Sequence, residues 1–488
     1  MTDSDIQALA KGGRTNFIGF LLRLAGRLPF LFIAGRWYGA EALGRFASAL
    51  VVIEFAALLC TLGQKRGLAQ RLSEDEERPA AVVADAMLLC GLIALAFGAV
   101  LYLLPAALFP SGTYGEIDRL LVLTILPIAL TDIALAALAY RYDVATSVRS
   151  RALVEPWTIS IVAGLAFYIV PSGGLSLAYI LSVYAAAFAA LWPLLRSYGL
   201  PRQWSPNPVS LARLAWRSLP LVAADAVEWG TRRLDIFILR FFAGEAAVGI
   251  YYAAQQVASL PQKLKTSFEP ILGPVITRNL KEGNLAAIAQ QVCQVGFWII
   301  AAQAGIALAL GIPGEGVMGL VGPAFVGGTG ALAFLLAAEV VAATAVVSEA
   351  ALVYVARLRN LWISLATIAL QAVLTVAGIG LVERFGYNDN FRAAAAAAAL
   401  MLALGFASLV KSRLLARILG APVNNWRWAL VWAAAPAVLV GWAFTRYLPE
   451  WVELLLGIPA ILLIYGWVIW HRGFGPEDRV LFRKNVGA

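Results

Sequence analysis

The chain contains few of the residues from which soluble active sites are built. Among its 488 residues it has one histidine, His471, and three cysteines, and only 14% of its residues are charged. A single histidine excludes histidine-based metal sites and a Ser-His-Asp triad. Cys60, Cys90 and Cys293 lie far apart within apolar runs, so the sequence predicts neither a disulfide framework nor a Cys-x-x-Cys motif. We therefore expect no metal and no resident cofactor. These absences leave other kinds of enzyme open, although our prediction is that the protein is not an enzyme.

Hydrophobic residues take the place of charged ones. They make up 61% of the chain, and the mean hydropathy is +0.78, whereas soluble proteins are about half apolar and about a quarter charged. The apolar runs are long enough to cross about 30 Å of hydrocarbon, and they lack the alternation of barrel strands. We predict an all-α polytopic membrane protein with about fourteen transmembrane helices. The predicted spans are residues 15–36, 46–64, 82–109, 120–140, 152–170, 175–195, 214–240, 247–268, 286–311, 329–355, 361–382, 393–416, 428–447 and 452–470.

Basic residues favour one side of the predicted membrane. With the N-terminus in the cytoplasm, the cytoplasmic segments carry 27 of the 38 Lys and Arg residues, and the opposite connectors carry seven. This is a strong positive-inside bias, and it predicts that both termini are cytoplasmic. It also accounts for the net charge of +9 through topology and anionic headgroups, so no nucleic acid partner is expected.

A short motif after the first predicted span recurs after the seventh. Residues 39–49 and 244–254 align at an offset of 205, with two glycines and two alanines in common. Six spans per unit is an even number, so two such units share one orientation, as in parallel-repeat transporters with a central cavity. We therefore predict two six-helix lobes related by a parallel repeat, plus two extra C-terminal helices. The predicted parts are an N-terminal lobe at 1–200, a C-terminal lobe at 210–417, two additional transmembrane helices at 428–470 and a cytoplasmic tail at 471–488.

Several stretches resemble a known group of membrane transporters. They are residues 37–46 (WYGAEALGRF), Leu62 with Gly63, and above all Arg233 to Gly244 running into Val248 to Ala254. On these motifs the sequence resembles the polysaccharide, or oligosaccharide-lipid, flippases of the multidrug/oligosaccharidyl-lipid/polysaccharide (MOP) exporter superfamily, over roughly residues 12–417. The lipid II flippase branch of that superfamily has a Pro-Asn stretch after the first span that this sequence lacks.

The resemblance implies a flippase for a polyprenyl-diphosphate-linked oligosaccharide. Such a protein works in the bacterial inner membrane during the synthesis of O-antigen, capsule or exopolysaccharide. It is expected to use alternating access with a cationic central cavity. The implied partners are the polyprenyl-diphosphate-linked glycan, membrane lipids, and glycosyltransferases and a polymerase of the same pathway.

Arginines inside the predicted spans are candidates for holding the diphosphate. An ionised side chain at bilayer depth costs about 2.5–3.5 kcal/mol, so each should face a cavity or a partner. Arg23 and Arg27 lie one turn apart on the first span, which has no acidic residue of its own. Arg232, in the seventh span, aligns with Arg27 at the repeat offset. Because guanidinium groups offer paired donors to phosphate oxygens, we predict that these three arginines bind the substrate.

Acidic residues in the predicted spans are candidates for adjusting how tightly the arginines bind the diphosphate. Asp225 and Glu228 share a helix face with Arg232, and Glu54 lies in the middle of the second span. We predict that these carboxylates tune or release the substrate, and that one of them takes up a coupling H+ or Na+. Two structural alternatives stay open: Arg232 neutralises Glu228 one turn away, and Glu54 pairs with an arginine of the first span.

Other functions remain open from the sequence. A lipid II-type exporter or an ion-coupled multidrug exporter of the same superfamily is the main alternative. An exporter of organic cations is expected to have an acidic cavity, and the arginines of the first span argue against it. A membrane-embedded polysaccharide polymerase would need a long ordered extracytoplasmic loop or a carboxylate cluster outside the bilayer. The predicted connectors on that side are no longer than about 20 residues.

Overall fold

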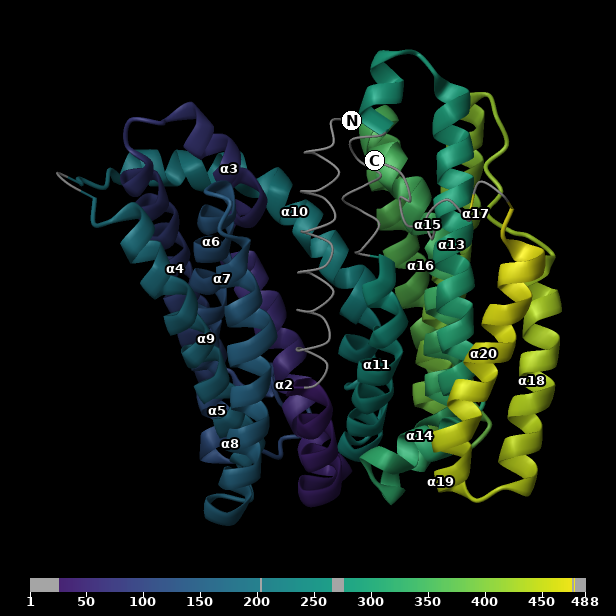
Figure 1. Ribbon diagram of the computed structural model, residues 1–488. Helices are drawn as coiled ribbons and strands as arrows, with labels where there is room; N and C mark the ends of the chain where they lie inside the picture. Colours follow the sequence, from purple (N-terminus) through teal and green to yellow (C-terminus); the bar gives the residue numbers. More distant parts are fainter. Residues whose placement is uncertain (1–25, 202–203, 266–275, 476–477, 479–488) are drawn as a thin grey trace, which may run out of the picture. The chain divides into compact units, whose positions relative to one another are not determined.

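The computed structural model describes residues 26–201, 204–265, 276–475 and 478. Within these residues every regular element is a helix (Figure 1). Contacts between Cα atoms divide the chain into two compact units, Met1–Tyr252 and Ala253–Ala488. The all-α fold that the composition predicted is therefore confirmed.

Eleven helical stretches in the described part of the chain are long and apolar enough to cross a membrane. Residues 15–25 of the first predicted run lie outside the described residues, and its remainder, 26–36, merges with the second run in one such stretch, Gly26–Glu74. The predicted run at 214–240 corresponds to the helix α10 (Pro208–Leu239), and the described part of the run at 247–268 lies in α11 (Glu245–Lys265). Neither helix is among the eleven. Charged side chains along α10 lower its hydropathy. The protein is a multi-pass membrane protein, and the count of fourteen spans stays a prediction.

The first unit is built around one helix, α6. Its longer helices are α2 (Gly39–Cys60), α3 (Gln64–Glu74), α4 (Pro79–Leu103), α6 (Ile125–Tyr140), α8 (Glu155–Ile169), α9 (Gly174–Tyr198) and α10. The helix α6 contacts α2, α3, α4 and α9, which places it at the centre of the unit. The helix α10 packs against α2 and α3, so its charged residues lie beside the end of α2 and the start of α3.

A tight turn joins α2 to α3. Leu62 and Gly63 both have left-handed backbone angles, with φ of 47° and 66°. A Cβ atom on Gly63 would lie 2.3 Å from the Cβ atom of Leu221 on α10. Glycine at this turn therefore allows α10 to approach the backbone closely, and this contact sets the start of α3 against α10.

The helices α2 and α11 cross at two glycines that the repeat aligns. A Cβ atom on Gly44 would lie 1.8 Å from the carbonyl oxygen of Glu245, and one on Gly249 would lie 2.1 Å from the carbonyl oxygen of Ala40. At the repeat offset Gly44 aligns with Gly249 and Ala40 aligns with Glu245, so the contact is reciprocal. This symmetry supports the repeat, while the boundaries of the two lobes stay a prediction.

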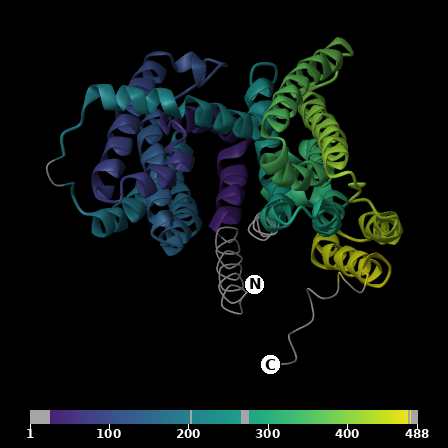
Figure 2. The ribbon, with the colours of Figure 1, turned by 90° about the horizontal axis from the view of Figure 1, so that it is seen from above.

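The second unit packs its helices around α13 and α17. Its helices are α13 (Leu285–Gly311), α14 (Gly314–Val321), α15 (Thr329–Val355), α16 (Arg357–Arg384), α17 (Asp389–Leu419), α18 (Ala429–Tyr447), α19 (Glu450–Val452) and α20 (Ile458–Val468). The helix α17 contacts α15 and α16, and α13 contacts α15, α18 and α20. Figure 2 shows α18 and α20, in yellow, side by side at one edge of this unit.

A polar contact anchors the chain after the last helix of the second unit. The carboxylate of Asp478 is buried and accepts hydrogen bonds from the Arg427 guanidinium at 2.6 Å and from the Trp298 indole N–H at 2.9 Å. The backbone N–H of Gly475 donates to the same side chain at 2.9 Å. These bonds tie the residues after α20 to α13 and to the segment between α17 and α18.

Candidate functional site

The helix α10 presents three charged side chains on one face. Asp225, Glu228 and Arg232 are spaced by three and four residues, so they project from the same side of the helix. Arg232 NH2 lies 3.2 Å from Glu228 Oε1. The ion pair between Glu228 and Arg232 that the sequence left open is therefore present.

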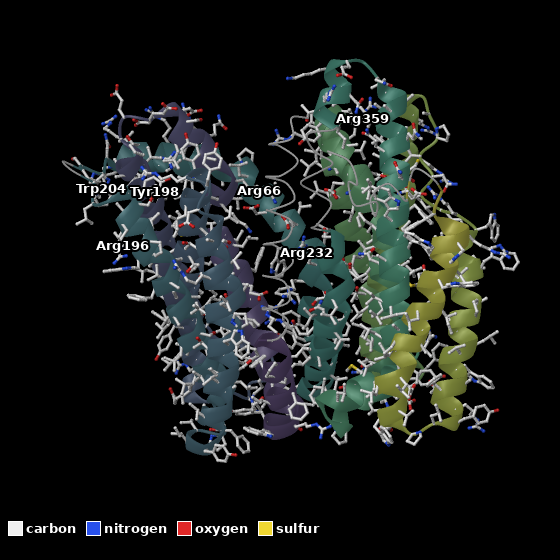
Figure 3. The ribbon with its side chains drawn as sticks, viewed as in Figure 1. Arg66, Arg196, Tyr198, Trp204, Arg232 and Arg359 are labelled. Carbon is white, nitrogen blue, oxygen red and sulfur yellow. The ribbon has the colours of Figure 1, made fainter. Side chains whose placement is uncertain are left out.

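A further arginine, Arg66 on α3, completes this charged face. Its Nε lies 2.6 Å from Asp225 Oδ1, and its NH2 lies 2.5 Å from Glu228 Oε2. Glu228 is thus shared by two guanidinium groups, Arg66 and Arg232, which both carry labels in Figure 3. The charges alternate along a chain of four side chains, which we call the ion-pair chain: Asp225, Arg66, Glu228 and Arg232.

Exposure divides the ion-pair chain into a fixed end and an accessible end. The side chain of Asp225 is 3% exposed, whereas those of Arg66, Glu228 and Arg232 are 45%, 48% and 43% exposed. Ion pairs between half-exposed side chains are weak and exchange easily. Glu228 can therefore leave its two arginines at little cost, whereas Asp225 holds Arg66 in place.

The start of α3 is positioned by polar contacts to α10. Gln64 Nε2 donates to the hydroxyl of Ser218 at 2.8 Å, and Gln64 Oε1 accepts from Arg71 at 3.0 Å. Gln64 and Ser218 are both buried. Together with the close approach at Gly63, these bonds fix the helix that carries Arg66.

Glu54 has its partner on α10. Its Oε2 lies 3.4 Å from Nε of Arg233, and both side chains are partly buried. The sequence had offered Arg23 or Arg27 as partners for this carboxylate. Arg23 lies outside the described residues. Arg27 is exposed, and no hydrogen bond or ion pair joins it to another residue that the structure describes.

Two more charged groups near the end of α10 are buried and hydrogen-bonded to neighbouring segments. Asp235 accepts a hydrogen bond from the hydroxyl of Tyr251. Arg240 donates to the carbonyl oxygens of Ser48 and Ala107, each at 2.8 Å. These contacts use backbone and hydroxyl groups of three neighbouring segments, so Asp235 and Arg240 stabilise the packing of the first unit.

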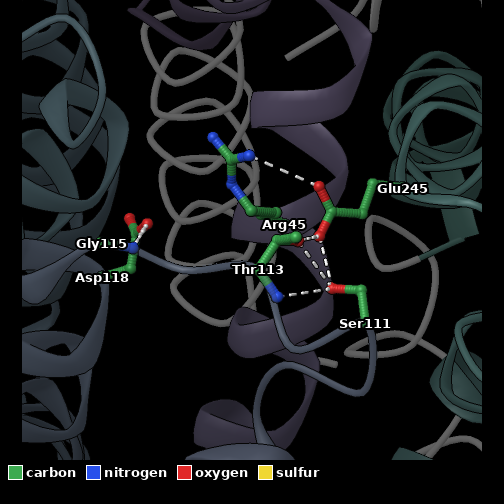
Figure 4. Close-up of polar contacts among 6 residues, drawn as sticks. All are labelled: Arg45, Ser111, Thr113, Gly115, Asp118 and Glu245. Carbon is green, nitrogen blue, oxygen red and sulfur yellow. Dashed lines mark hydrogen bonds and ion pairs between the residues drawn. The ribbon is translucent and has the colours of Figure 1, made fainter.

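A second polar cluster lies next to the glycine crossing (Figure 4). Glu245, the first residue of α11, has its Oε2 3.5 Å from NH1 of Arg45 on α2. The hydroxyl of Ser111 donates to Glu245 Oε1 at 2.5 Å, and the hydroxyl of Thr113 donates to the same oxygen. The carboxylate therefore joins α2, the segment after α4 and the start of α11.

Sequence reasoning missed Arg66 because it lies in a connector of mixed charge, and such runs usually form solvated surfaces. The signal beside it was the Leu62 and Gly63 turn, which brings the start of α3 back onto α10. In the described part of the chain, no three His, Cys, Asp or Glu side chains gather where they would hold a metal ion. The chemistry that this site offers is ion pairing with an anion or a cation.

Solved structures of membrane transporters share this fold. The chain is similar to a structure of lipid II flippase MurJ in an inward closed conformation, with a TM-score of 0.71, 13% identity, and coverage of 96% of this chain and 99% of that one. An inward-facing multidrug resistance MATE family transporter of the MOP superfamily gives a TM-score of 0.65 and 15% identity, over 81% of this chain and 94% of the other. A MOP superfamily transporter from Pyrococcus furiosus gives a TM-score of 0.57 and 14% identity, over 85% of this chain and 95% of the other.

The sequence itself also matches a family. No curated protein matches the chain. Residues 35–301, more than half of the chain, match the family described as polysaccharide biosynthesis protein. This segment contains the motifs on which the sequence resembles the oligosaccharide-lipid flippases, as well as all four members of the ion-pair chain. The chain therefore belongs to the polysaccharide biosynthesis protein family and has the fold of the MOP superfamily transporters.

Proposed function

We propose that the protein is a flippase that moves a polyprenyl-diphosphate-linked oligosaccharide from the cytoplasmic to the outer leaflet of a bacterial inner membrane by alternating access. Membership of the polysaccharide biosynthesis family supports a glycan pathway. The likeness to a structure named as a lipid II flippase supports a lipid-linked substrate. The glycan belongs to a surface polysaccharide, and the glycosyltransferases and polymerase of that pathway supply and consume the substrate and its product.

The observation that carries this proposal is the shared carboxylate of the ion-pair chain. Arg66 and Arg232 both bind Glu228, and all three side chains are close to half exposed. A diphosphate has two anionic groups and forms strong paired hydrogen bonds with guanidinium groups. It can therefore replace Glu228 between the two arginines. Arg27, which is exposed, adds a third cation, and Arg23 is proposed with it from the sequence.

Release of the substrate follows from the same exchange. When the diphosphate leaves, Glu228 returns to Arg66 and Arg232, so neither arginine is left without a counter-charge. Asp225 keeps Arg66 oriented throughout, because its side chain is buried. Protonation of Glu228, or binding of Na+ by it, weakens its competition with the substrate and is the proposed route for coupling to an ion. Glu54 acts on this site through its ion pair with Arg233.

A multidrug exporter is the alternative that the same residues allow. Asp225 and Glu228 would then attract an organic cation, and the fold is similar to that of a multidrug resistance MATE family transporter. The two proposals differ in the sign of the substrate. Loss of Arg232 should abolish transport of an anionic lipid, whereas it should leave transport of a cation unchanged or raise it.

The experiment is a flipping assay in vesicles that contain the purified protein and a fluorescently labelled polyprenyl-diphosphate glycan. Arg232→Gln should lower the flipping rate by at least tenfold while protein abundance stays near that of the wild type, because Arg232 and Glu228 are both close to half exposed. Arg66→Lys keeps a positive charge beside the buried Asp225 but loses the paired donors of the guanidinium group, so it should also lower the flipping rate without lowering abundance. Arg278→Gln is the matched control, because Arg278 also forms an exposed ion pair one turn away, with Glu282 at 3.0 Å. Equal rates for wild type and both site variants would disprove the proposed role of the ion-pair chain.

A further inference from the structure

The buried face of α16 is polar. Polar side chains recur there at intervals of three or four residues, so they lie on one side of the helix. They are Asn360, Ser364, Thr367, Gln371 and Thr375. Helices in membranes place such side chains against neighbouring helices, and each buried polar group then needs a hydrogen-bond partner. The partners of this stripe therefore show what occupies the space beside it.

Near the start of α16, Ser364 and Thr367 have partners within the second unit, whereas Asn360 donates to Glu349 at 3.4 Å and its Oδ1 atom finds no partner among the described residues. Lys411 Nζ on α17 lies 3.0 Å from Ser364 Oγ and 2.9 Å from Glu349 Oε2 on α15. The hydroxyl of Thr367 donates to the carbonyl oxygen of Ile363, one turn back on its own helix, at 2.8 Å. Side chains and backbone provide every one of these bonds.

The deeper half of the stripe is not satisfied in this way. Gln371 and Thr375 are both fully buried. Among the residues that the structure describes, Gln371 Nε2, Gln371 Oε1 and Thr375 Oγ1 find no hydrogen-bond partner. The two residues are one turn apart on the same face, so their polar atoms point to one region. An amide and a hydroxyl left unpaired in apolar surroundings would be strongly unfavourable.

The helix that faces them offers no side-chain partner. The helix α17 runs antiparallel to α16, because Ser364 contacts Lys411 and a Cβ atom on Gly378 would lie 3.5 Å from that of Ala395. Gln371 and Thr375 lie between these two points. Most buried α17 residues there are alanines: Ala396, Ala397, Ala399, Ala403 and Ala407. Alanine has no donor or acceptor in its side chain, and its small size leaves room beside α16.

The chemistry of the unpaired atoms identifies the ligand. The amide of Gln371 has two donor hydrogens and an acceptor oxygen, and the hydroxyl of Thr375 can donate and accept. A metal cation would satisfy the oxygens but would leave the amide N–H groups unpaired. Water accepts from N–H groups and donates to oxygens at the same time, and buried water binds where several polar partners meet. We infer that at least one water molecule is bound between α16 and α17, where it bridges Gln371 and Thr375.

This water site has a consequence for how the second unit holds together. Lipid offers no water to the hydrocarbon core, so a water molecule at this depth is enclosed by protein. It joins α16 to its neighbours through hydrogen bonds in a region where alanine packing alone would give few contacts. The site continues the polar stripe beyond the contacts of Lys411, so one polar line follows α16 from Asn360 to Thr375.

The test is a double-mutant cycle on the full-length protein in lipid nanodiscs, read by thermal unfolding. Gln371→Leu and Thr375→Val should each lower Tm by about 2–4 °C. The double variant should lower it by less than the sum, because either substitution already removes the bridge. Thr367→Val is the matched control. Its hydroxyl is satisfied by its own helix, so its effect should add to that of Gln371→Leu.

Two outcomes would overturn the inference. If Gln371→Leu raises Tm and its effect adds to that of Thr375→Val, the site is dry. If Na+ raises the Tm of the wild type more than K+ or choline does, and Gln371→Leu removes this effect, the ligand is a cation. Should Gln371→Leu fail to fold, Thr375→Ser and Thr375→Val decide the question. The serine variant keeps the hydroxyl and should keep the wild-type Tm, whereas equal losses for both variants would contradict a hydrogen-bonded water.

Discussion

At the scale of single residues, Arg66 holds the ion-pair chain together, because it links Asp225 and Glu228 on α10 to the start of α3. The ion pair of Glu228 and Arg232 could be predicted from the sequence, because residues four apart on a helix are neighbours on its surface. The contact of Arg66 with the same carboxylate could not be predicted from the sequence. It depends on the left-handed turn at Gly63 and on a helix more than 150 residues further along the chain. Local charge patterns carry no information about such distant partners.

The ion pair of Glu54 and Arg233 allows a test of whether these two charges stabilise the fold. Both side chains are partly buried, so removing one partner leaves a charge without compensation. We expect Arg233→Gln alone to lower protein abundance in the membrane and to destabilise the fold by about 1–3 kcal/mol. The double variant Glu54→Gln with Arg233→Gln should recover most of that abundance. Quantitative immunoblotting of membranes measures the abundance, and thermal unfolding measures the stability. A double variant no better than the single one would show that the two residues act separately.

At the scale of helices, the repeat is the feature that sequence and structure share. The aligned motifs were visible as glycines and alanines at a constant offset. The structure adds that the aligned glycines of α2 and α11 contact each other's helices reciprocally. Sequence could not predict this, because a glycine pattern indicates that a backbone approaches but does not identify which backbone.

The glycine crossing should not tolerate even one methyl group. A Cβ atom on Gly249 would lie 2.1 Å from the backbone oxygen of Ala40, which cannot rotate away. We expect Gly249→Ala to force α2 and α11 apart and to cost about 1–3 kcal/mol of stability. Gly380→Ala on α16 is the control, because nothing lies within 4 Å of its added Cβ atom. Thermal unfolding in nanodiscs compares the two. Equal Tm values for both variants would contradict the close crossing.

The segment after α20 should respond to acid through Asp478. Burial raises the pKa of this carboxyl, but hydrogen bonds from Arg427, the Gly475 N–H and Trp298 outweigh it and hold the pKa below its ordinary value. A carboxylate with a lowered pKa stabilises the fold at pH above its unfolded value of about 3.9, and this contribution is lost as the pH falls through the folded value.

The corresponding variant is Asp478→Asn. It should be less stable than the wild type at pH 7, by about 1.5–3 kcal/mol, because hydrogen bonds to a charged group are replaced by weaker ones. The difference should shrink as the pH is lowered below about 4. Unfolding midpoints measured from pH 7 to pH 3 provide the check. A difference that stays constant over this range would show that the charge of Asp478 does not stabilise the segment.

At the scale of the whole molecule, composition predicted the class of protein. The number of membrane spans was harder to predict, because charged residues lower the hydropathy of some helices. The apolar runs identified a helical membrane protein, because they are long enough to cross the hydrocarbon layer as helices and lack the alternation of barrel strands. Among the residues that the structure describes, eleven stretches reach the length and hydropathy of a span, whereas α10 and α11 do not. The helix α10 falls short because it carries the charged residues of the candidate site. The property that makes a helix functional thus also weakens its sequence signal.

The predicted topology can be tested with reporter fusions. The bias of basic residues predicts fourteen spans with both termini in the cytoplasm. A reporter fused after residue 488 should report the cytoplasm, and one fused after residue 390, at the start of α17, should report the opposite side. Alkaline phosphatase and green fluorescent protein report opposite sides and check each other. Both fusion points on the same side would overturn the predicted topology.

The central claim is that the protein recognises the diphosphate of a lipid-linked glycan, and a comparison of headgroups tests it most directly. Purified wild-type protein in vesicles would be given labelled polyprenyl diphosphate glycan, the matching monophosphate and a fluorescent organic cation. The account predicts rapid flipping of the diphosphate lipid, at least tenfold slower flipping of the monophosphate and no transport of the cation. Transport of the cation without flipping of the diphosphate lipid, or equal flipping of both phosphate lipids, would contradict it.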